Sequence, residues 1–160
     1  MPFTHPDHAL QASSVLRAQC PDDLELAVAG LVHDSGHLLG DAEHAEAGAM
    51  AVRAVLGERV AWLAGLHVAA KLYLVARQVT YGGTFAADWR RFAGACAPWW
   101  AHVSGRRAGR VRGDAQRQDA LLLRRADESR KVDGLEVVGL GDWMPIVRRA
   151  SVSGRVATSR

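Results

Sequence analysis

The sequence predicts an all-α protein, a helical bundle in which metal-ligating side chains converge from about five helices. Three observations support this fold class. Apolar residues recur with a period near 3.6 residues, helix start and stop signals separate the apolar segments, and the strict alternation of a β-strand is missing. A chain of 160 residues has the length of one domain with one core, and we expect this domain to span 1–150.

The first two helices are predicted on either side of an acidic start signal. An apolar stripe runs over 10–16, and a second apolar segment, 24–32, follows the Pro-Asp-Asp run at 21–23. The carboxylates of this run suit the positive end of a helix dipole. Gly36 and Gly40 indicate where the second helix ends.

Two further helices are predicted after these glycines. The third covers about 44–56 and ends at Gly57. The fourth covers about 59–77 and places His67 and Lys71 on one face.

The second half of the chain is less regular. A fifth helix over about 119–131 precedes a turn-like Gly-Leu-Gly run at 139–141. The small, polar tail 151–160 is expected to be disordered. Residues 78–118 show no clear periodicity and are rich in Gly, Ala, Arg and Trp.

Composition limits the class of protein. Apolar residues make up 49% of the chain, but Arg59 and Lys71 interrupt the longest apolar stretches before they reach membrane-spanning length. The first residues lack the basic and apolar stretches of a secretory signal. Two cysteines, Cys20 and Cys96, are too few for a disulfide framework. We therefore expect a cytoplasmic protein with no membrane partner.

Charge is distributed unevenly along the chain. Residues 1–77 carry five Lys/Arg and nine Asp/Glu, whereas 78–160 carry fifteen and eight. Arginines interleaved with tryptophans in 78–118 are compatible with binding to single-stranded nucleic acid. Nucleic acid is nevertheless a minor alternative, because a shifted reading frame also explains the composition of this segment.

His33 and Asp34 form the most informative pair, because an adjacent imidazole and carboxylate can both bind metal and the carboxylate can bridge two ions. Separate helices supply further candidate ligands, which are His8, His44, His67 and Asp127. A helix bundle can hold such a set, and these N/O ligands fit Fe, Mn, Zn or Ni. For any single histidine the alternative is an ordinary helix or core imidazole, but the ordered set favours a metal centre.

Cationic side chains are predicted beside these ligands. His37 follows a glycine that allows close approach, and Lys71 shares a helix face with His67. Arg124 lies three residues before Asp127 and points in a similar direction. These three side chains could clamp an anion. The alternatives are a solvated His37–Lys71 pair and a solvated basic face that contains Arg124.

The order of these motifs along the chain resembles a known family. The runs are His8-Ala9-Leu10-Gln11, His33-Asp34-Ser35-Gly36-His37-Leu38-Leu39, His44-Ala45-Glu46-Ala47-Gly48-Ala49, His67-Val68-Ala69-Ala70-Lys71, Leu123-Arg124-Arg125-Ala126-Asp127 and Lys131-Val132-Asp133-Gly134-Leu135-Glu136-Val137. They resemble the HD-domain oxygenases of phosphonate degradation, the branch like 2-amino-1-hydroxyethylphosphonate dioxygenase and related to myo-inositol oxygenase. The resemblance covers 3–77 and 119 to about 149, and it implies an HD-domain helical bundle.

The resemblance also implies a function. A mixed-valent Fe(II)/Fe(III) centre would use O2 to cleave the carbon–phosphorus bond of a 1-hydroxyphosphonate, with an amino acid and phosphate as products. The implied ligands of one iron are His8, His33, Asp34 and Asp127. Those of the other are Asp34, His44 and His67. The implied phosphonate-binding residues are His37, Lys71 and Arg124, and the implied catalytic residues are Asp34, His37 and Lys71.

The chain departs from the family pattern in three places. A substrate-responsive lid, formed by a tyrosine and a glutamate ahead of the first histidine, is expected to be absent. The connection between Asp34 and His44 is shorter than in the family. Ser-Pro-Ala-Ser and Gly-Gly-Pro-Met motifs are missing between Lys71 and Asp127.

A shifted reading frame explains the missing motifs. Residues 99–103 can be encoded by TGG-TGG-GCC-CAT-GT, which reads Gly-Gly-Pro-Met one base later, and 92–94 can be encoded by TTC-GCC-GG, which reads Ser-Pro in the same offset. We therefore hypothesise that 78–118 is a frame-shifted or disordered segment, a change that would impair activity if the family motifs are needed for turnover. The nucleotide sequence of the gene tests this interpretation.

Two alternatives to the oxygenase stay open. A metal-dependent phosphohydrolase of the HD superfamily would use Mn, Zn or Ni to activate a hydroxide against a phosphoester. A degenerate chain would retain a metal-binding scaffold without turnover. As an oxygenase, the protein would have a small phosphonate and O2 as its partners.

Overall fold

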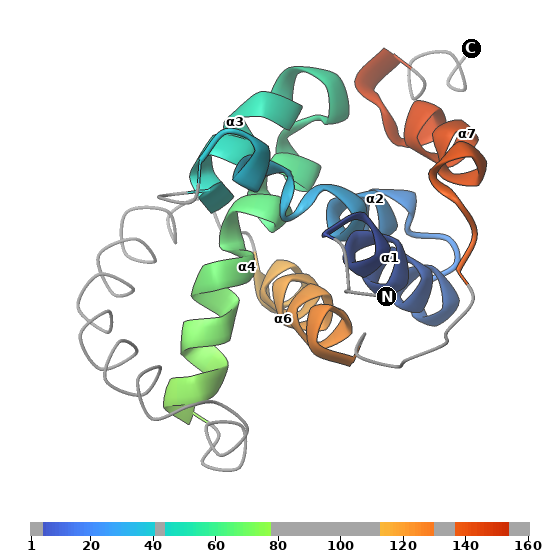
Figure 1. The fold of residues 1–160 in the computed structure, drawn as a ribbon. Coiled ribbons are helices and arrows are strands. Elements are labelled where there is room, and N and C mark those ends of the chain that lie inside the picture. Colours follow the sequence, from blue (N-terminus) through green and yellow to red (C-terminus); the bar gives the residue numbers. More distant parts are fainter. Residues whose placement is uncertain (1–4, 41–43, 78–112, 130–136, 154–160) are drawn as a thin grey trace.

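The computed structural model describes residues 5–40, 44–77, 113–129 and 137–153, and within these ranges every regular element is a helix (Figure 1). In chain order the elements are α1 (His5–Gln19), α2 (Leu24–Val32), the short 3-10 helix η1 (Ser35–Leu38), α3 (His44–Leu56), α4 (Glu58–Arg77), α6 (Gly113–Ser129) and α7 (Leu140–Ala150). The all-α prediction is confirmed for this part of the chain. None of its helices combines the length and the apolar character needed to cross a bilayer.

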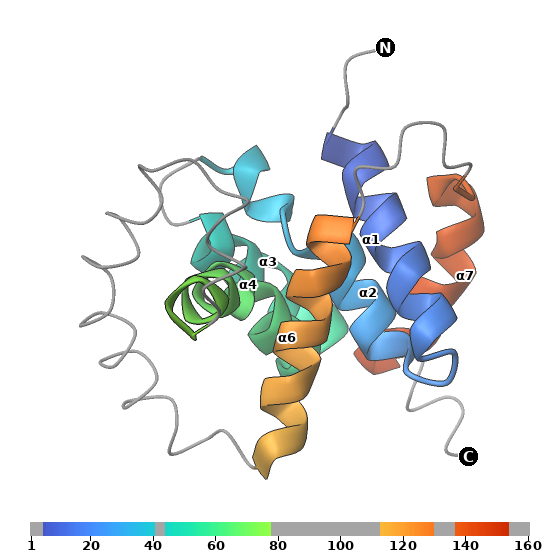
Figure 2. The same cartoon turned by 90° about the horizontal axis from the view of Figure 1, so that it is seen from below.

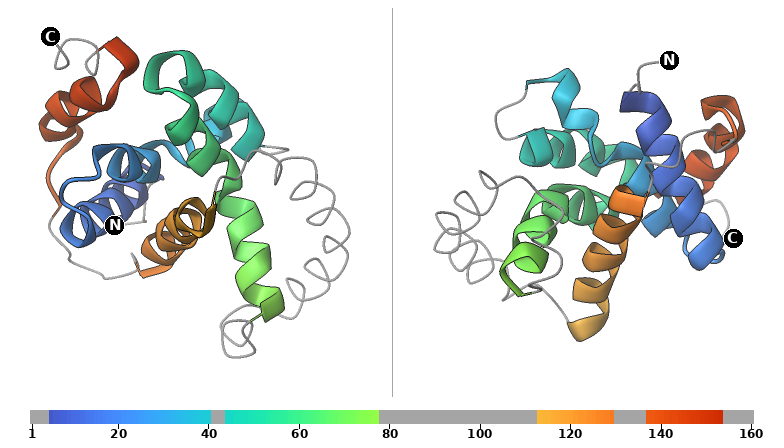
Figure 3. Two further views of the ribbon diagram at one scale, coloured as in Figure 1. Left: turned by 180° about the vertical axis from the view of Figure 1, so that it is seen from behind. Right: turned by 60° about the horizontal axis from the view of Figure 1, so that its bottom comes forward.

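Two helix pairs and a joining helix make up the bundle. α1 packs against α2, and α3 packs against α4. α6 contacts both α1 and α4, and Figure 2 shows it lying between them. α7 packs against α2, and Figure 3 shows it on the side of the bundle formed by α1 and α2. The arrangement brings α1, α2, α4 and α6 around one interior.

That interior is filled by branched apolar side chains from four helices. Leu16, Val28, Leu63 and Leu123 come from α1, α2, α4 and α6, respectively, and each is fully buried. Burial of one such side chain contributes about 1.5–3 kcal/mol to stability. The core therefore fixes the relative positions of the four helices that carry most of the predicted metal ligands.

A charged network joins the starts of α2 and α4 to the first half of α6. Asp23 caps α2, since its Oδ1 accepts a hydrogen bond from the Leu26 backbone N–H at 3.0 Å. Arg59, near the start of α4, donates to both carboxylate oxygens of Asp23, at 2.7 and 2.6 Å, and to Asp119 Oδ2 of α6 at 2.9 Å. The hydrogen bonds from Arg59 lower the pKa of Asp23, although partial burial acts in the opposite direction. The network holds α2, α4 and α6 together.

The substitution Asp23→Asn is expected to lower the free energy of unfolding at neutral pH and to have little effect in acid. Asparagine still caps a helix, so the change removes chiefly the charge facing Arg59. Because folding lowers the pKa of Asp23, its contribution is fully present above the unfolded-state pKa of about 3.9. The contribution is lost as the pH falls through the folded-state pKa. Chemical denaturation at several pH values measures this, and a difference independent of pH would contradict it.

Two helix boundaries differ from the sequence predictions. α6 begins at Gly113 instead of near 119, and Asp119, the predicted start, lies inside the helix and pairs with Arg59. α2 ends at Val32, and the residues before Gly40 form η1. Of the atypical segment 78–118, residues 78–112 lie outside the described residues, as do 154–160 of the tail.

The sequence did not predict α7. The Gly-Leu-Gly run at 139–141 indicated a turn, but Gly139 precedes the helix in extended backbone and Leu140 begins it. Trp143, which is 1% exposed, packs with Leu10 of α1 and Ala27 of α2. Burial of this indole against other helices outweighs the low helix propensity of the local sequence.

Candidate metal centre

The six predicted ligands come from five parts of the bundle. His8 lies on α1, His67 on α4 and Asp127 near the end of α6. His33 is the C-cap of α2, Asp34 follows it directly, and His44 begins α3. The fold brings them together in two groups, whose members are His8, His33, Asp34 and Asp127 in the first and Asp34, His44 and His67 in the second. In each group the potential ligand atoms all lie within 4.8 Å of one another.

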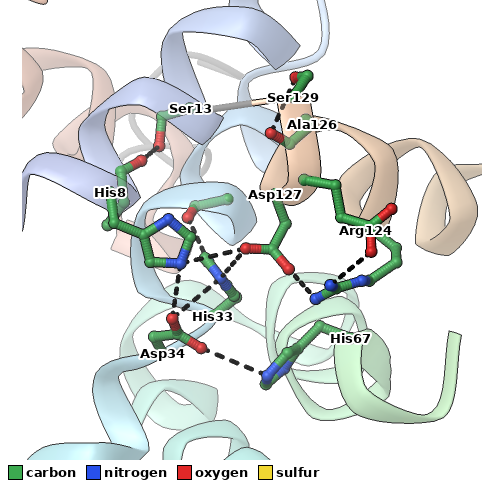
Figure 4. A network of polar contacts seen from close by, with 12 residues as sticks. His8, Ser13, His33, Asp34, His67, Arg124, Ala126, Asp127 and Ser129 are labelled. Atoms are coloured by element: carbon green, nitrogen blue, oxygen red, sulfur yellow. Dashed lines mark hydrogen bonds and ion pairs between the residues drawn. The ribbon is translucent and has the colours of Figure 1, made fainter. Parts of the chain in front are cut away.

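The first group surrounds a single point (Figure 4). His8 Nε2 lies 2.8 Å from Asp34 Oδ2 and 3.1 Å from Asp127 Oδ1. His33 Nε2 lies 3.3 and 3.2 Å from the same two oxygens. Ligand atoms bound to one ion at about 2.0–2.1 Å are themselves about 3 Å apart. The two imidazoles and two carboxylates therefore have the spacing of a metal site.

The second group shares Asp34 with the first. Asp34 Oδ1 lies 3.4 Å from His67 Nε2, whereas Oδ2 of the same carboxylate faces His8 and His33. His44 Nε2 lies 3.3 Å from His67 Nε2. Because the two oxygens of Asp34 face different groups, this carboxylate has the geometry of a bridge between two ions.

Backbone carbonyls set the tautomers of two histidines. His33 Nδ1 donates a hydrogen bond to the Gly30 carbonyl at 2.7 Å, and His67 Nδ1 donates to the Ala64 carbonyl at 2.7 Å. In a neutral imidazole this leaves the Nε2 lone pair available. Both Nε2 atoms face the ligand groups, so the carbonyls aim the lone pairs at the centre, as groups hydrogen-bonded to the other nitrogen of a metal-bound histidine do.

The surroundings of Asp34 keep its carboxylate charged, and those of His67 keep its imidazole neutral. Burial acts to raise the pKa of Asp34, but hydrogen bonds to His33 and His8 outweigh it and hold this pKa well below its usual range. Burial, assisted by repulsion from His33, lowers the pKa of His67 to about 3. Metal binding requires the deprotonated forms of both side chains, and the folded chain supplies them at neutral pH.

The two groups differ in their access to solvent. His8, His33 and Asp127 of the first group are buried, whereas His44 and Asp34 are only partly buried. The first group offers four protein ligands and the second offers three. A site with fewer protein ligands leaves positions for substrate or water, so the second group is the open side of the centre.

A close backbone contact positions His44 at that open side. A Cβ atom added to Gly36 in η1 would lie 1.7 Å from the His44 carbonyl oxygen and 2.9 Å from the Gly48 backbone nitrogen in α3. A Cβ added to Gly48 would, in turn, lie 2.9 Å from the Gly36 nitrogen. The two glycines let η1 lie directly against the first turns of α3, beside the Asp34 bridge.

The substitution Gly36→Ala is therefore expected to displace His44 and to lower metal content from two ions to one. The added methyl group meets rigid backbone, and overpacking of this kind costs about 1–3 kcal/mol. Metal analysis after Fe(II) loading measures the effect. Gly141→Ala is the matched control, because a Cβ at Gly141 meets nothing within 4 Å. Two bound ions in Gly36→Ala would contradict the expected role of this contact.

The three predicted cationic residues have different surroundings. The rings of His37 and His44 stack, with centroids 3.9 Å apart and planes 17° apart. Arg124 is buried and donates to Asp127 Oδ2 of the first group. Lys71 is partly buried on α4, four residues after His67 and so on the same helix face.

Three contributors to the site were not predicted from the sequence. The carbonyls of Gly30 and Ala64 each lie three residues before a candidate ligand, a spacing that any helix provides and that carries no distinguishing signal. Glu128 accepts a hydrogen bond from Arg124, and the i,i+4 spacing of these opposite charges was a signal that could have indicated the pair.

Comparison of the chain with protein-family models and with curated proteins finds no match.

Proposed function

We propose that this protein is a di-iron oxygenase that cleaves the carbon–phosphorus bond of a 1-hydroxyphosphonate. The observation that carries the proposal is the division of Asp34 between two ligand groups, one oxygen facing each. A centre with two ions and a carboxylate bridge is the simplest use of this geometry. The motif order of the HD-domain oxygenases, described above, supports the choice of iron and of O2 chemistry.

The donor set fits iron. Imidazole nitrogen and carboxylate oxygen are ligands that suit Fe, as well as Mn, Zn and Ni. A mixed-valent pair would bring five positive charges, of which the carboxylates of Asp34 and Asp127 offset two. The remaining positive charge would attract a phosphonate dianion to the open side of the centre. When bound, the irons would supply the redox chemistry and the activation of O2.

The side chains of this protein would bind and orient the substrate. Lys71 and His37 would hold phosphonate oxygens at the open, three-ligand side, with Arg124 contributing charge from the buried side. The hydroxyl on the carbon beside phosphorus would then point toward the second group. Burial of His8, His33 and Asp127 would exclude water from the first group.

The proposed reaction needs no external reductant. The substrate carbon loses its C–H and C–P bonds and becomes a carboxylate, while phosphorus leaves as inorganic phosphate. Both atoms of one O2 are accounted for in the amino acid and the phosphate, so one O2 is consumed for each phosphate released. This stoichiometry distinguishes the reaction from hydrolysis.

The test is anaerobic loading of the full chain with Fe(II), followed by assay of O2 uptake and phosphate release. The substrates are 2-amino-1-hydroxyethylphosphonate and its trimethylated analogue, and the control is His33→Ala, which removes a ligand. Equal amounts of O2 consumed and phosphate released, absent in the control, are expected. Two bound irons with neither product would overturn the proposal.

The phosphohydrolase is the second candidate, because the same all-N/O donor set and shared carboxylate also suit Mn, Zn or Ni. In that reaction the ions, when bound, would supply Lewis-acid activation of water for hydrolysis of a phosphoester, and His37, Lys71 and Arg124 would hold phosphoryl oxygens. Phosphate release from a phosphoester without O2 consumption would favour this function over the oxygenase.

A further inference from the structure

The guanidinium of Arg124 is shared by two neighbouring carboxylates of α6. Its Nη1 donates to Asp127 Oδ2, and its Nη2 donates to Glu128 Oε1 at 2.8 Å. Figure 4 shows the guanidinium on the side of Asp127 that is turned away from His8 and His33. Arg124 is 6% exposed, whereas Glu128 is partly exposed at the edge of the helix. The three side chains form a line from the surface to the first ligand group.

The two oxygens of Asp127 have separate partners. Oδ1 lies 3.1 Å from His8 Nε2 and 3.2 Å from His33 Nε2, toward the proposed ion, and Oδ2 accepts from Arg124. The carboxylate group of an aspartate can rotate about χ2, because the preferred values of this torsion are broad and roughly two-fold. The hydrogen bond from Arg124 restrains that rotation and keeps Oδ1 turned toward the histidines.

Arg124 in turn needs a fixed position to restrain Asp127. A guanidinium presents its donors in a rigid, planar fork, so anchoring one nitrogen orients the other. Glu128 anchors Nη2, while Nη1 contacts Asp127. A buried arginine also requires compensating negative charge, and Glu128 provides it from outside the ligand set.

We propose that Glu128 is a positioning residue of the metal centre, which holds Arg124 so that Arg124 keeps Asp127 Oδ1 turned toward the first ion. The inference rests on the proposed metal centre and extends it to a side chain that is not itself a ligand. An ordinary surface Arg–Glu pair on a helix would leave metal affinity unchanged, so metal affinity is the property that separates the two roles.

The test measures anaerobic Fe(II) binding to the full-length protein by competition with a chelator. Glu128→Ala is expected to weaken binding at the first group about 10-fold, the low end of the range for losing a group hydrogen-bonded to a ligand, because Glu128 acts on Asp127 through Arg124. Glu128→Gln, whose amide oxygen still accepts a hydrogen bond, is expected to weaken it less. Glu58→Ala is the matched control, because Glu58 is an exposed glutamate paired with Arg53 on the surface.

A double-mutant cycle shows whether Glu128 acts through Arg124. If it does, adding Glu128→Ala to Arg124→Met, which removes the guanidinium, should weaken Fe(II) binding no further than Arg124→Met alone. Additive effects would overturn the proposed route.

Two other outcomes separate the inference from the proposed function. Wild-type affinity in Glu128→Ala, or a loss equal to that in Glu58→Ala, would overturn the role of Glu128 and leave the metal centre intact. Failure of the wild-type chain to bind Fe(II) would instead remove the proposed function and the inference with it. If Glu128→Ala fails to fold, Glu128→Gln tests the role with a smaller expected loss of Fe(II) affinity, and wild-type affinity in that variant would overturn it.

Discussion

Replacing Asp34 by alanine is expected to remove both metal ions. Asp34 Oδ2 lies within 2.8 Å of His8 Nε2 in the first group, and Oδ1 lies 3.4 Å from His67 Nε2 in the second. The substitution deletes a ligand from each group and leaves the second group with two imidazoles. It also removes one of two carboxylates that offset the charge of the ions, so the remaining ligands face greater repulsion between metals.

The size of this loss distinguishes a bridge from an ordinary ligand. His8→Ala removes a member of the first group alone, and His44→Ala a member of the second alone. Each is therefore expected to spare the ion at the other group, whereas Asp34→Ala spares neither. Metal analysis after Fe(II) loading measures all three variants. Retention of two ions in Asp34→Ala would contradict the bridging geometry.

The Asp34→Ala variant is expected to fold, which makes its metal content interpretable. The His67 pKa is about 3, so this ring is neutral without the carboxylate. Asp34 acts to raise that pKa, and its removal therefore favours the neutral ring further. Circular dichroism of the apo protein provides the control, with a wild-type helical spectrum as the expected result.

The substitution Lys71→Met is expected to lower kcat/KM on the phosphonate while leaving metal content unchanged. Methionine keeps most of the apolar stem but removes the ammonium group that would hold a phosphonate oxygen. A hydrogen bond to a charged group contributes about 1.5–3 kcal/mol, which corresponds to a fall of about 10- to 100-fold. Steady-state phosphate release, measured at saturating O2 on Fe(II)-loaded protein, checks this expectation.

Two comparisons make the Lys71 result specific. Lys71→Arg retains the positive charge and is expected to lose less activity than Lys71→Met. Arg53→Met removes a cation from an exposed pair with Glu58 and should leave kcat/KM at the wild-type value. Equal losses in Lys71→Met and Arg53→Met would show that general charge, and not a phosphonate contact, is responsible.

The helices were predictable where local signals agreed with packing. The boundaries of α3 and α4 follow the apolar period and the break at Gly57, which adopts a φ of 90° that glycine tolerates. α7 was missed because its glycine and proline content lowers local helix propensity, whereas its formation depends on burying Trp143 against α1 and α2. A helix that forms because of contacts with residues far away in the sequence need not show a periodic apolar pattern of its own.

The candidate site shows the same division. The side chains that could bind metal were recognisable from the residue pattern alone: adjacent His33 and Asp34, and further histidines and an aspartate at helical positions. Ligand chemistry is a property of the residue, so it is readable without coordinates. Gly36 and Gly48 could also be read from the sequence. Their close contact could not, because it joins the backbones of two separate segments.

The directions in which these groups point follow from the packing of the helices. It turned the two oxygens of Asp34 toward different histidines, directed His33 and His67 through carbonyls of their own helices, and placed Arg124 between Asp127 and Glu128. Each of these outcomes depends on a side-chain torsion and on a partner supplied by the packing of α1, α2, α4 and α6. A sequence specifies the available donors, whereas their direction is set by the surrounding helices once the core has closed.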